Sequence, residues 1–247
     1  MRVGAIGVGI HALTSILPNL PGAGITLSAT CARHLARAEA AAARFGCRAA
    51  FDDAERMLDA VALDGVVVVV PPDQFSSVVR ACIRRGGPVF AEKPAANDAA
   101  EAADLAARFF FGELEDIHVQ RGKGTEHTVA ALAKSESGAV VNIRANTTGS
   151  WEQHNEAVEI FGEGHSLFVD NIDTCTWRPP ARPEHTWRPN YTVPVALNMT
   201  SATMGFGPEL EHFRRVVTEG IPNESDLSSA AATLALTSQI AEQALQG

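Results

Sequence analysis

The sequence predicts an α/β protein that begins with a doubly wound parallel sheet and continues into a second, mainly antiparallel part. Strand-like and helix-like segments alternate through roughly the first ninety residues, which is typical of parallel strands joined by helices. A valine run at residues 66–70 predicts a central strand covered on both faces. Beyond Gly112 the pattern changes to extended segments separated by turns. We therefore expect two domains, residues 1–108 and 109–247.

Hydrophobic spacing predicts the individual elements of the first domain. Residues 2–6 form a strand pattern, and Ala12, Ile16 and Leu20 share one helical face until Pro21 and Gly22 stop it. The expected elements that follow are an extended segment at 25–31, a helix at 35–45 ended by Gly46, a short helix near 55–61, a strand at 66–70, a helix around 78–83, a strand at 88–92 and an Ala-rich helix from 98 to about 109.

The second domain has the pattern of an antiparallel meander. Extended segments are expected at 128–134, 139–147, 157–161 and 166–169, with turn residues at 137–138 and 162–164. The Pro-rich stretch 179–194 holds several aromatic residues, so we expect an ordered covering loop there. Two helices close the chain, one with Leu210 and Phe213 on its apolar face and the other over about 226–244.

Composition excludes several classes of protein. The 247 residues carry a formal net charge of -9, which argues against a surface for nucleic acid. No apolar run approaches the ~20 residues of a membrane span, and the N-terminus does not resemble a secretory signal. Cysteines 31, 47, 82 and 175 lack the spacing of a metal site, so we expect free core thiols, no disulfide, no metal and a cytoplasmic location.

A glycine-rich turn joins the first strand to the first helix. Gly7, Gly9 and Ala12 form the pattern G-x-G-x-x-A in the βαβ context of dinucleotide binding. Gly7 permits the tight turn, Gly9 lets a diphosphate approach the backbone, and Ala12 allows close helix packing. Ile10, inside the turn, is expected at the cofactor too, whereas the sequence gives His11 no role. The alternative is a plain glycine-rich turn.

The end of the second strand bears on the choice of cofactor. An acidic residue that would bind the adenosine ribose is absent there, and Arg33 follows, with Arg37 one helical turn later. A guanidinium offers a planar fork of donors to a 2′-phosphate, which favours NADP over NAD. A solvated arginine at a helix start remains the alternative.

Two further strand ends are expected at the same edge of the sheet, where open α/β sheets bind ligands. Pro71 follows the valine strand, and Glu92, Lys93 and Pro94 follow the next one. Lys93 is suited to donate a proton or hydrogen bond to a substrate oxygen, and Glu92 to orient it or contact the nicotinamide. A salt-bridged surface lysine is the default alternative.

These motifs together resemble the glucose-fructose oxidoreductase, inositol dehydrogenase and MocA family. The resemblance rests on Gly7-x-Gly9-x-x-Ala12, on Ala32-Arg33, on residues 70–74 and above all on Glu92-Lys93-Pro94, and it extends to residues 137–140, 159–164 and 207–213. It implies a Rossmann-like domain followed by an α+β domain with a large open, mainly antiparallel sheet. It also implies NAD(P)-linked hydride transfer to or from a hydroxyl or ketone of a sugar or cyclitol.

One departure from the family pattern affects the mechanism. The family continues after the Ala-rich helix into a segment that supplies further catalytic residues, including a histidine, whereas here residues 104–113 run directly into the later sheet. Either the gene carries an internal deletion or the sequence omits a segment of a longer protein. Lys93 is then the catalytic residue left, and an alternative function is a catalytically silent nucleotide-binding sensor or scaffold.

The remaining expectations concern substrate and assembly. None of the histidines at 118, 127, 154, 165, 185 and 212 has a spacing that marks it as a replacement base. His185 and Trp187, in the expected covering loop, are the candidate contacts for a polyol or sugar ring. An open sheet with an apolar face usually needs a partner, so we expect a homo-oligomer formed through that sheet.

Overall fold

The computed structural model describes residues 1–92, 113–122, 128–146, 156–171, 174–188 and 205–223, together with single residues and pairs between 225 and 243. The chain divides into two compact units, one formed by Met1–Lys93 and His154–Asn223, the other by Pro94–Gln153 and Glu224–Gly247. The expected boundary between residues 108 and 109 and the expected helix at 98–109 lie outside the described residues.

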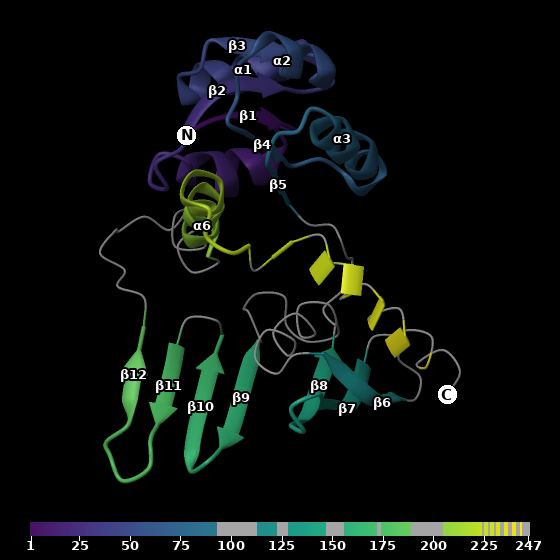
Figure 1. Ribbon diagram of the computed structural model, residues 1–247, viewed down its shortest axis with the longest axis vertical. Helices are drawn as coiled ribbons and strands as arrows, with labels where there is room; N and C mark the ends of the chain where they lie inside the picture. The colour runs from purple at the N-terminus through teal and green to yellow at the C-terminus, as the bar shows by residue number, and fades with distance from the viewer. Residues whose placement is uncertain are drawn as a thin grey trace. The chain divides into compact units, whose positions relative to one another are not determined.

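A five-stranded parallel sheet forms the centre of the first unit (Figure 1), which confirms the predicted fold class. Its strands lie in the order β3-β2-β1-β4-β5. Their bounds are β1 Arg2–Ile6, β2 Thr26–Cys31, β3 Ala49–Phe51, β4 Gly65–Val68 and β5 Val89–Ala91. The order reverses between β1 and β4, so the crevice outside their carboxyl ends is the expected ligand position of this fold. Strand β3 was not among the elements expected from the sequence.

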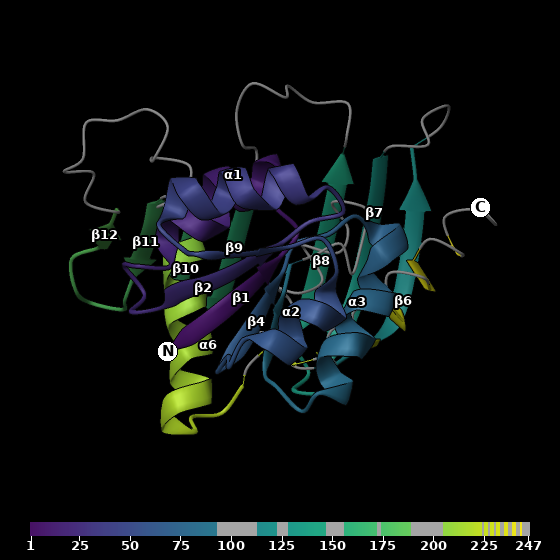
Figure 2. The ribbon, with the colours of Figure 1, turned by 90° about the horizontal axis from the view of Figure 1, so that it is seen from above.

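Helices cover both faces of this sheet (Figure 2). Helices α2 (Ala54–Ala60) and α3 (Pro72–Arg84) pack with Met57, Val79 and Cys82 against one face. Helix α1 (Leu35–Phe45) is held to β2 because the buried Thr30 hydroxyl donates to the Ala38 carbonyl at 2.8 Å. The helix ends where predicted, since Gly46 adopts φ 73° at its C-cap.

The first helix departs from regular α geometry. A π-helical turn at Ala12–Ile16 (η1) runs into a 3-10 turn at Leu17–Asn19 (η2). Pro18 lacks a backbone N–H and its ring crowds the preceding turn, so a regular α-helix cannot continue through it. The Thr14 hydroxyl also donates back to the Ile10 carbonyl at 2.8 Å. The helical spacing was read correctly, but the helix type was not.

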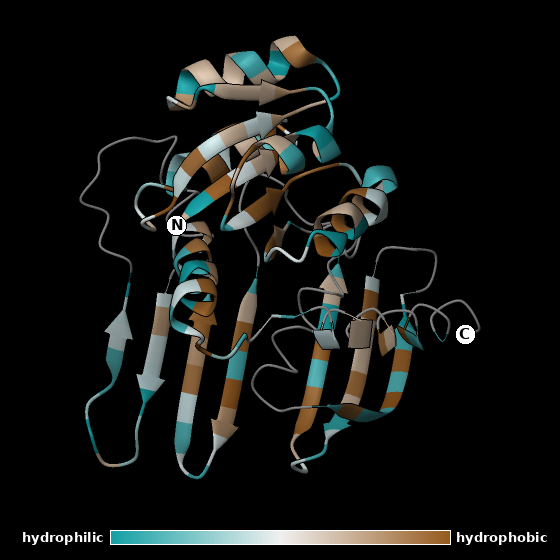
Figure 3. Cartoon of the chain, turned by 45° about the horizontal axis from the view of Figure 1, so that its top comes forward, coloured by the Kyte–Doolittle hydropathy of each residue, from teal (hydrophilic) through white to brown (hydrophobic). Residues whose placement is uncertain are grey.

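Antiparallel strands form two further sheets, which confirms the expected antiparallel pattern. One is β9 (Ala157–Gly162), β10 (His165–Asp170), β11 (Thr174–Arg178) and β12 (His185–Trp187); the other is β6 (Leu114–Arg121), β7 (Thr128–Ser135) and β8 (Val140–Asn146). Figure 3 shows alternating polar and apolar bands along β8 and β9, as half-exposed strands require. Strand β6 was not expected, and part of the presumed covering loop is the edge strand β12.

Helix α6 (Phe206–Glu219) belongs to the first unit and completes its core. Phe206 and Leu210 are buried with Leu17 and Leu20 against Val3 and Val67 of the parallel sheet, and Phe213 packs on the same cluster. In the second unit Ile117, Ala131 and Ile143 form a core with Leu236 and Ile240. The described residues between 228 and 243 are helical. Among the described residues no helix combines the length and apolar character that a membrane crossing needs.

The end of β1 lies unusually close to the backbone that follows β4. The Gly7 N–H donates to the Cys31 carbonyl at 2.9 Å, the Val69 N–H donates to the Ile6 carbonyl at 2.8 Å, and Gly7 adopts φ 93°. A Cβ atom built on Gly7 would lie 1.9 Å from the Val69 carbonyl oxygen. Gly7 is therefore the residue that lets the chain turn at this strand end.

We expect Gly7→Ala to destabilise the fold strongly. The left-handed backbone alone costs about 1–3 kcal/mol for an alanine, and the clash with Val69 adds to it. Urea denaturation followed by circular dichroism measures the loss. Gly9→Ala is the matched control, because nothing lies within 4 Å of a Cβ built on Gly9. Equal stability of the Gly7→Ala variant and the parent chain would contradict this role.

Candidate functional site

Open space above Gly9 marks the carboxyl edge of the parallel sheet. Gly9 and Ile10 are exposed, with Ile10 at 83%, while Ala12 is fully buried beneath them. The Leu13 N–H already donates to the Gly9 carbonyl at 3.0 Å, so the helix begins immediately after the turn. A backbone without side chain at this helix start is suited to an anionic group of a ligand. Of the residues expected from the glycine pattern, Gly9 and Ile10 are thus open, whereas Ala12 is enclosed.

Arg33 lies just beyond the end of β2 and is exposed. Within the described residues no carboxylate pairs with its guanidinium, so this group is free to bind an anion. Two acidic residues, Asp52 and Asp53, follow β3, and both carboxylates contact Arg56. Asp52 pairs with the Arg56 guanidinium at 3.1 Å, and the Asp53 carboxylate caps α2 by accepting from the Arg56 N–H at 2.8 Å. Arg33 is therefore an exposed cation beyond the end of β2.

The other two strand ends differ in how much of them is described. Pro71 is exposed and caps α3, where its carbonyl accepts hydrogen bonds from the N–H groups of Gln74 and Phe75 at 3.0 and 3.2 Å. Glu92 follows β5, and its N–H donates to the Val68 carbonyl at 2.9 Å. Lys93 and Pro94, the predicted catalytic and cofactor residues beside it, lie outside the described residues.

Glu92 contacts a residue to which the sequence assigned no role. Its side chain is 7% exposed, and its Oε2 lies 3.3 Å from Nε2 of His11. The His11 ring also meets the Phe206 ring edge-on, with centroids 5.4 Å apart. No motif spacing indicates this contact, because it joins the start of the first helix to the end of β5 across the end of β4.

The expected substrate contacts His185 and Trp187 lie on the edge strand β12. Both are exposed, Trp187 at 61%. The His185 ring stacks on Trp177, whose Nε1 donates to Nδ1 of His165 at 3.1 Å. Their proposed contact with substrate stays a prediction.

The other histidines occupy separate elements. His118 is exposed on β6, and His212 lies in α6 with its Nε2 buried and without a hydrogen-bond partner among the described residues. His127 and His154 lie outside the described residues. The two described histidines of this set, His118 and His212, thus lie on elements outside the parallel sheet.

The four cysteines are free thiols. Burial raises the pKa of the Cys31 thiol to about 11, with a smaller effect of the carboxylates of Asp53 and Asp52. Burial likewise raises the pKa of Cys82 to about 11. Both side chains stay protonated at neutral pH, so they act as packing residues and not as nucleophiles. Within the described parts of the chain, His, Cys, Asp and Glu form no group of three or more able to hold a metal ion.

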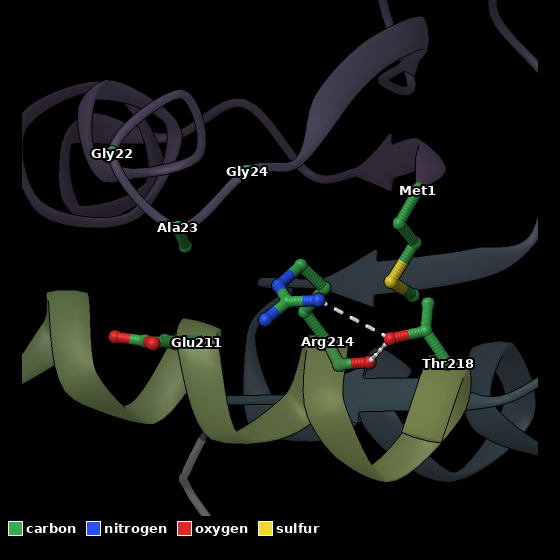
Figure 4. Close-up of a pocket in the computed structure, with 7 residues that line it drawn as sticks. All are labelled: Met1, Gly22, Ala23, Gly24, Glu211, Arg214 and Thr218. Atoms are coloured by element: carbon green, nitrogen blue, oxygen red, sulfur yellow. Dashed lines mark hydrogen bonds between the residues drawn. The ribbon is translucent and has the colours of Figure 1, made fainter. Parts of the chain in front are cut away.

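A pocket of about 420 Å³ lies at the other edge of the parallel sheet (Figure 4). Glu211, Arg214 and Thr218 of α6 line it opposite Met1 and the turn before β2. Met1 and residues 22–24 precede the amino ends of β1 and β2, whereas ligands of parallel α/β sheets bind at the carboxyl ends. The pocket is therefore separate from the glycine turn.

Known proteins match part of this chain in sequence, through one family profile and one curated relative. Residues 1–109 match the sequence profile of an oxidoreductase family with an NAD-binding Rossmann fold, GFO_IDH_MocA. Inositol 2-dehydrogenase from Leifsonia xyli subsp. xyli is 38% identical over 128 residues, which cover 49% of this chain and 35% of that relative. The match thus spans about a third of the relative's length.

Solved structures resemble the whole chain in fold. A dehydrogenase from Chromobacterium violaceum superimposes with a TM-score of 0.80 at 18% identity, covering 100% of this chain and 94% of the other. UDP-N-acetylglucosamine 3-dehydrogenase from Acidithiobacillus ferrooxidans superimposes with a TM-score of 0.78 at 16% identity, covering 99% and 97%. At such low identity the likeness concerns the fold and not the activity.

Proposed function

We propose that this chain is an NADP-preferring oxidoreductase, because residues 1–109 match the profile of the GFO_IDH_MocA oxidoreductase family with its NAD-binding Rossmann fold. It transfers hydride to or from a hydroxyl or ketone of a sugar-like or cyclitol-like substrate. The open backbone at Gly9, directly beside the sealed turn at Gly7, is the observation that carries this proposal. It leaves room for a diphosphate where the fold binds dinucleotides.

The cofactor is held by residues that follow four strands of the parallel sheet, β1, β2, β4 and β5. Gly7, Gly9, Ile10 and Ala12 form the diphosphate turn, and Pro71, Glu92, Lys93 and Pro94 line the nicotinamide side. Arg33 binds the 2′-phosphate, because its guanidinium is exposed and free of carboxylate partners among the described residues. The bound nicotinamide supplies or accepts the hydride, and the chain's own groups orient it and handle the proton.

The substrate class follows from the relatives and from the chemistry of Lys93. Inositol 2-dehydrogenase and UDP-N-acetylglucosamine 3-dehydrogenase both have names that describe dehydrogenation of polyhydroxylated rings. An ammonium group at position 93 donates a hydrogen bond or proton to the substrate oxygen. His185 and Trp187 are proposed to contact the polar ring. A cytoplasmic location stays a prediction from the sequence.

We also propose that the sheet β9–β12 joins two copies of the chain. Across its four strands Ile160, Leu167, Trp177 and His185 lie in register and share one face. The next row on this face is Val158, Val169, Cys175 and Trp187. None of these side chains is buried. A second copy would cover the apolar rows and remove them from water.

Removal of the Arg33 guanidinium should change the affinity for NADPH alone. We expect Arg33→Ala to raise the dissociation constant for NADPH about tenfold to a hundredfold, because a charge-assisted hydrogen bond is lost, and to leave NADH binding unchanged. Fluorescence titration with both nucleotides measures this. Arg80→Ala, at an exposed arginine of α3, is the control. Equal affinity of the parent chain for NADH and NADPH would refute the assignment of Arg33.

Loss of the Lys93 ammonium should abolish most of the turnover. We expect Lys93→Met to lower kcat about 10²- to 10⁴-fold on the substrate found by screening polyols, cyclitols and sugars, with NADPH binding retained. Lys134→Met is the control, since this exposed lysine of β7 pairs with Asp116 of β6, outside the parallel sheet. If the parent chain binds NADPH but oxidises and reduces nothing on a broad panel, the silent sensor is the better description.

The interface proposal predicts a mass in solution. We expect the parent chain to elute at twice its 26.1 kDa or more, and Trp177→Glu to elute as a monomer, because a charge at the centre of the apolar rows cannot be buried without a partner. Size-exclusion chromatography with light scattering measures both. Thr186→Glu, exposed on the opposite face of β12, should keep the parent mass. A monomeric parent chain would rule the interface out.

A further inference from the structure

A histidine and a buried carboxylate meet at the edge where the proposed cofactor binds. His11 follows the Gly7 turn, and Glu92 follows β5, so both stand at carboxyl ends of the parallel sheet. The two strands are separated by β4, and the Glu92 side chain spans that gap to bring Oε2 within 3.3 Å of His11 Nε2. His11 and Glu92 thus form a histidine–carboxylate pair at the same sheet edge as the glycine turn.

Burial makes the contact important for Glu92. With 7% of its side chain exposed, the carboxylate is largely removed from water, and a buried carboxylate without a partner costs several kcal/mol. Within the described residues His11 provides the polar contact to its side chain. The pair is thus a fixed part of the strand end, unlike the exposed ion pairs elsewhere on the surface.

His11 is held on two sides and open on another. Glu92 faces its Nε2, and the Phe206 ring from α6 lies edge-on to it at 5.4 Å. The side chain is nevertheless 44% exposed. Within the described residues no hydrogen bond to Nδ1 is present.

The carboxylate selects which nitrogen of the neutral ring carries the proton. A carboxylate oxygen 3.3 Å from Nε2 electrostatically favours the tautomer with N–H at Nε2. Nδ1 then has the lone pair. A ring in this state can accept a proton at Nδ1.

We propose that His11 is the proton acceptor and donor of the hydride transfer proposed above, and that Glu92 positions it and fixes its tautomer. The assignment rests on the proposed function. In the oxidation direction the C–H bond of the substrate breaks and its electron pair leaves as hydride to the oxidised nicotinamide. The O–H proton moves to Nδ1 of His11, and the O–H electrons form the carbonyl. Reduction runs the same transfers in reverse.

Lys93 and His11 then have different tasks. The ammonium of Lys93 hydrogen-bonds the substrate oxygen and favours the developing alkoxide, while His11 takes the proton away. Loss of His11 should therefore slow the chemical step and leave binding intact.

The experiment compares the full chain with His11→Gln, His11→Ala and Glu92→Gln. We expect His11→Gln to lower kcat about 10²- to 10⁴-fold, with KM and the NADPH dissociation constant changed less than about threefold. Glu92→Gln should lower kcat less, because the imidazole remains. His118→Gln, an exposed histidine of β6, is the matched control and should keep the parent rate. Thermal melts establish that each variant is folded.

Two further readouts distinguish proton transfer from a purely structural role. Added imidazole should restore part of the rate of His11→Ala, because the position is accessible to solvent. Nitrogen-15 NMR of labelled histidine should show the Nε2–H tautomer for His11 in the parent chain and a mixture of tautomers in Glu92→Gln. The NMR measurement does not depend on turnover or on bound nucleotide.

Each contrary result has a defined meaning. A His11→Gln variant with the parent kcat, a loss confined to KM or nucleotide affinity, a failure of imidazole rescue in folded His11→Ala, or an Nδ1–H tautomer in the parent overturns the role of His11 and leaves the proposed function standing. A parent chain that binds no dinucleotide, or binds it without turnover, overturns the proposed function and this assignment together.

Discussion

The close approach of two strand ends is the constraint on which the rest of the site depends. The Ile6 carbonyl accepts from the Val69 N–H, and the next residue, Gly7, turns so tightly that any side chain there would overlap the Val69 carbonyl. This contact fixes where β1 stops and where the first helix begins. The open backbone at Gly9 and the position of His11 both follow from it, since each is set by that helix start.

The charge pattern along the edge follows from the same sheet order. Arg33 lies beyond β2, and Glu92 lies beyond β5, at opposite sides of the turn after β1. The carboxylates beside the arginine are held by Arg56, and the carboxylate of Glu92 is held by His11. The anionic cofactor proposed for this edge would meet an exposed cation at one end and a carboxylate paired with an imidazole at the other. This arrangement limits the repulsion that a bare Glu92 would exert on a diphosphate.

The sequence predicted the features that local spacing encodes. The valine strand, the turn at Gly7 and the stop at Gly46 all depend on neighbouring residues, and each appears in the structure. The helix type after the turn was missed because Pro18 disturbs a ladder whose apolar spacing still fits a regular helix. Strand β6 was missed because Leu114, Ile117 and Val119 do not alternate regularly, and its pairing with β7 shifts register between Glu115 and His118.

The candidate site was predictable only in part, for a different physical reason. Gly9 and Arg33 follow from motif position, whereas the contact between His11 and Glu92 joins residues 81 positions apart, through a sheet order that no local pattern specifies. Position 11 is unspecified in the turn motif, so its residue type provides no signal until the strands are arranged in space.

Helix α6 connects the far end of the sequence to this edge. Its buried Leu210 packs with Leu17 and Leu20 beneath the parallel sheet, and its first residue, Phe206, contacts His11. The core of the first unit and the contact of Phe206 with His11 are therefore complete only when α6 has packed against the parallel sheet. Since the hydrophobic burial of α6 and the placement of Phe206 are one packing event, the orientation of His11 depends on a helix that follows it by about two hundred residues in the sequence. Local propensity sets the glycine turn, but the imidazole beside it is fixed only when the C-terminal part of the first unit has folded.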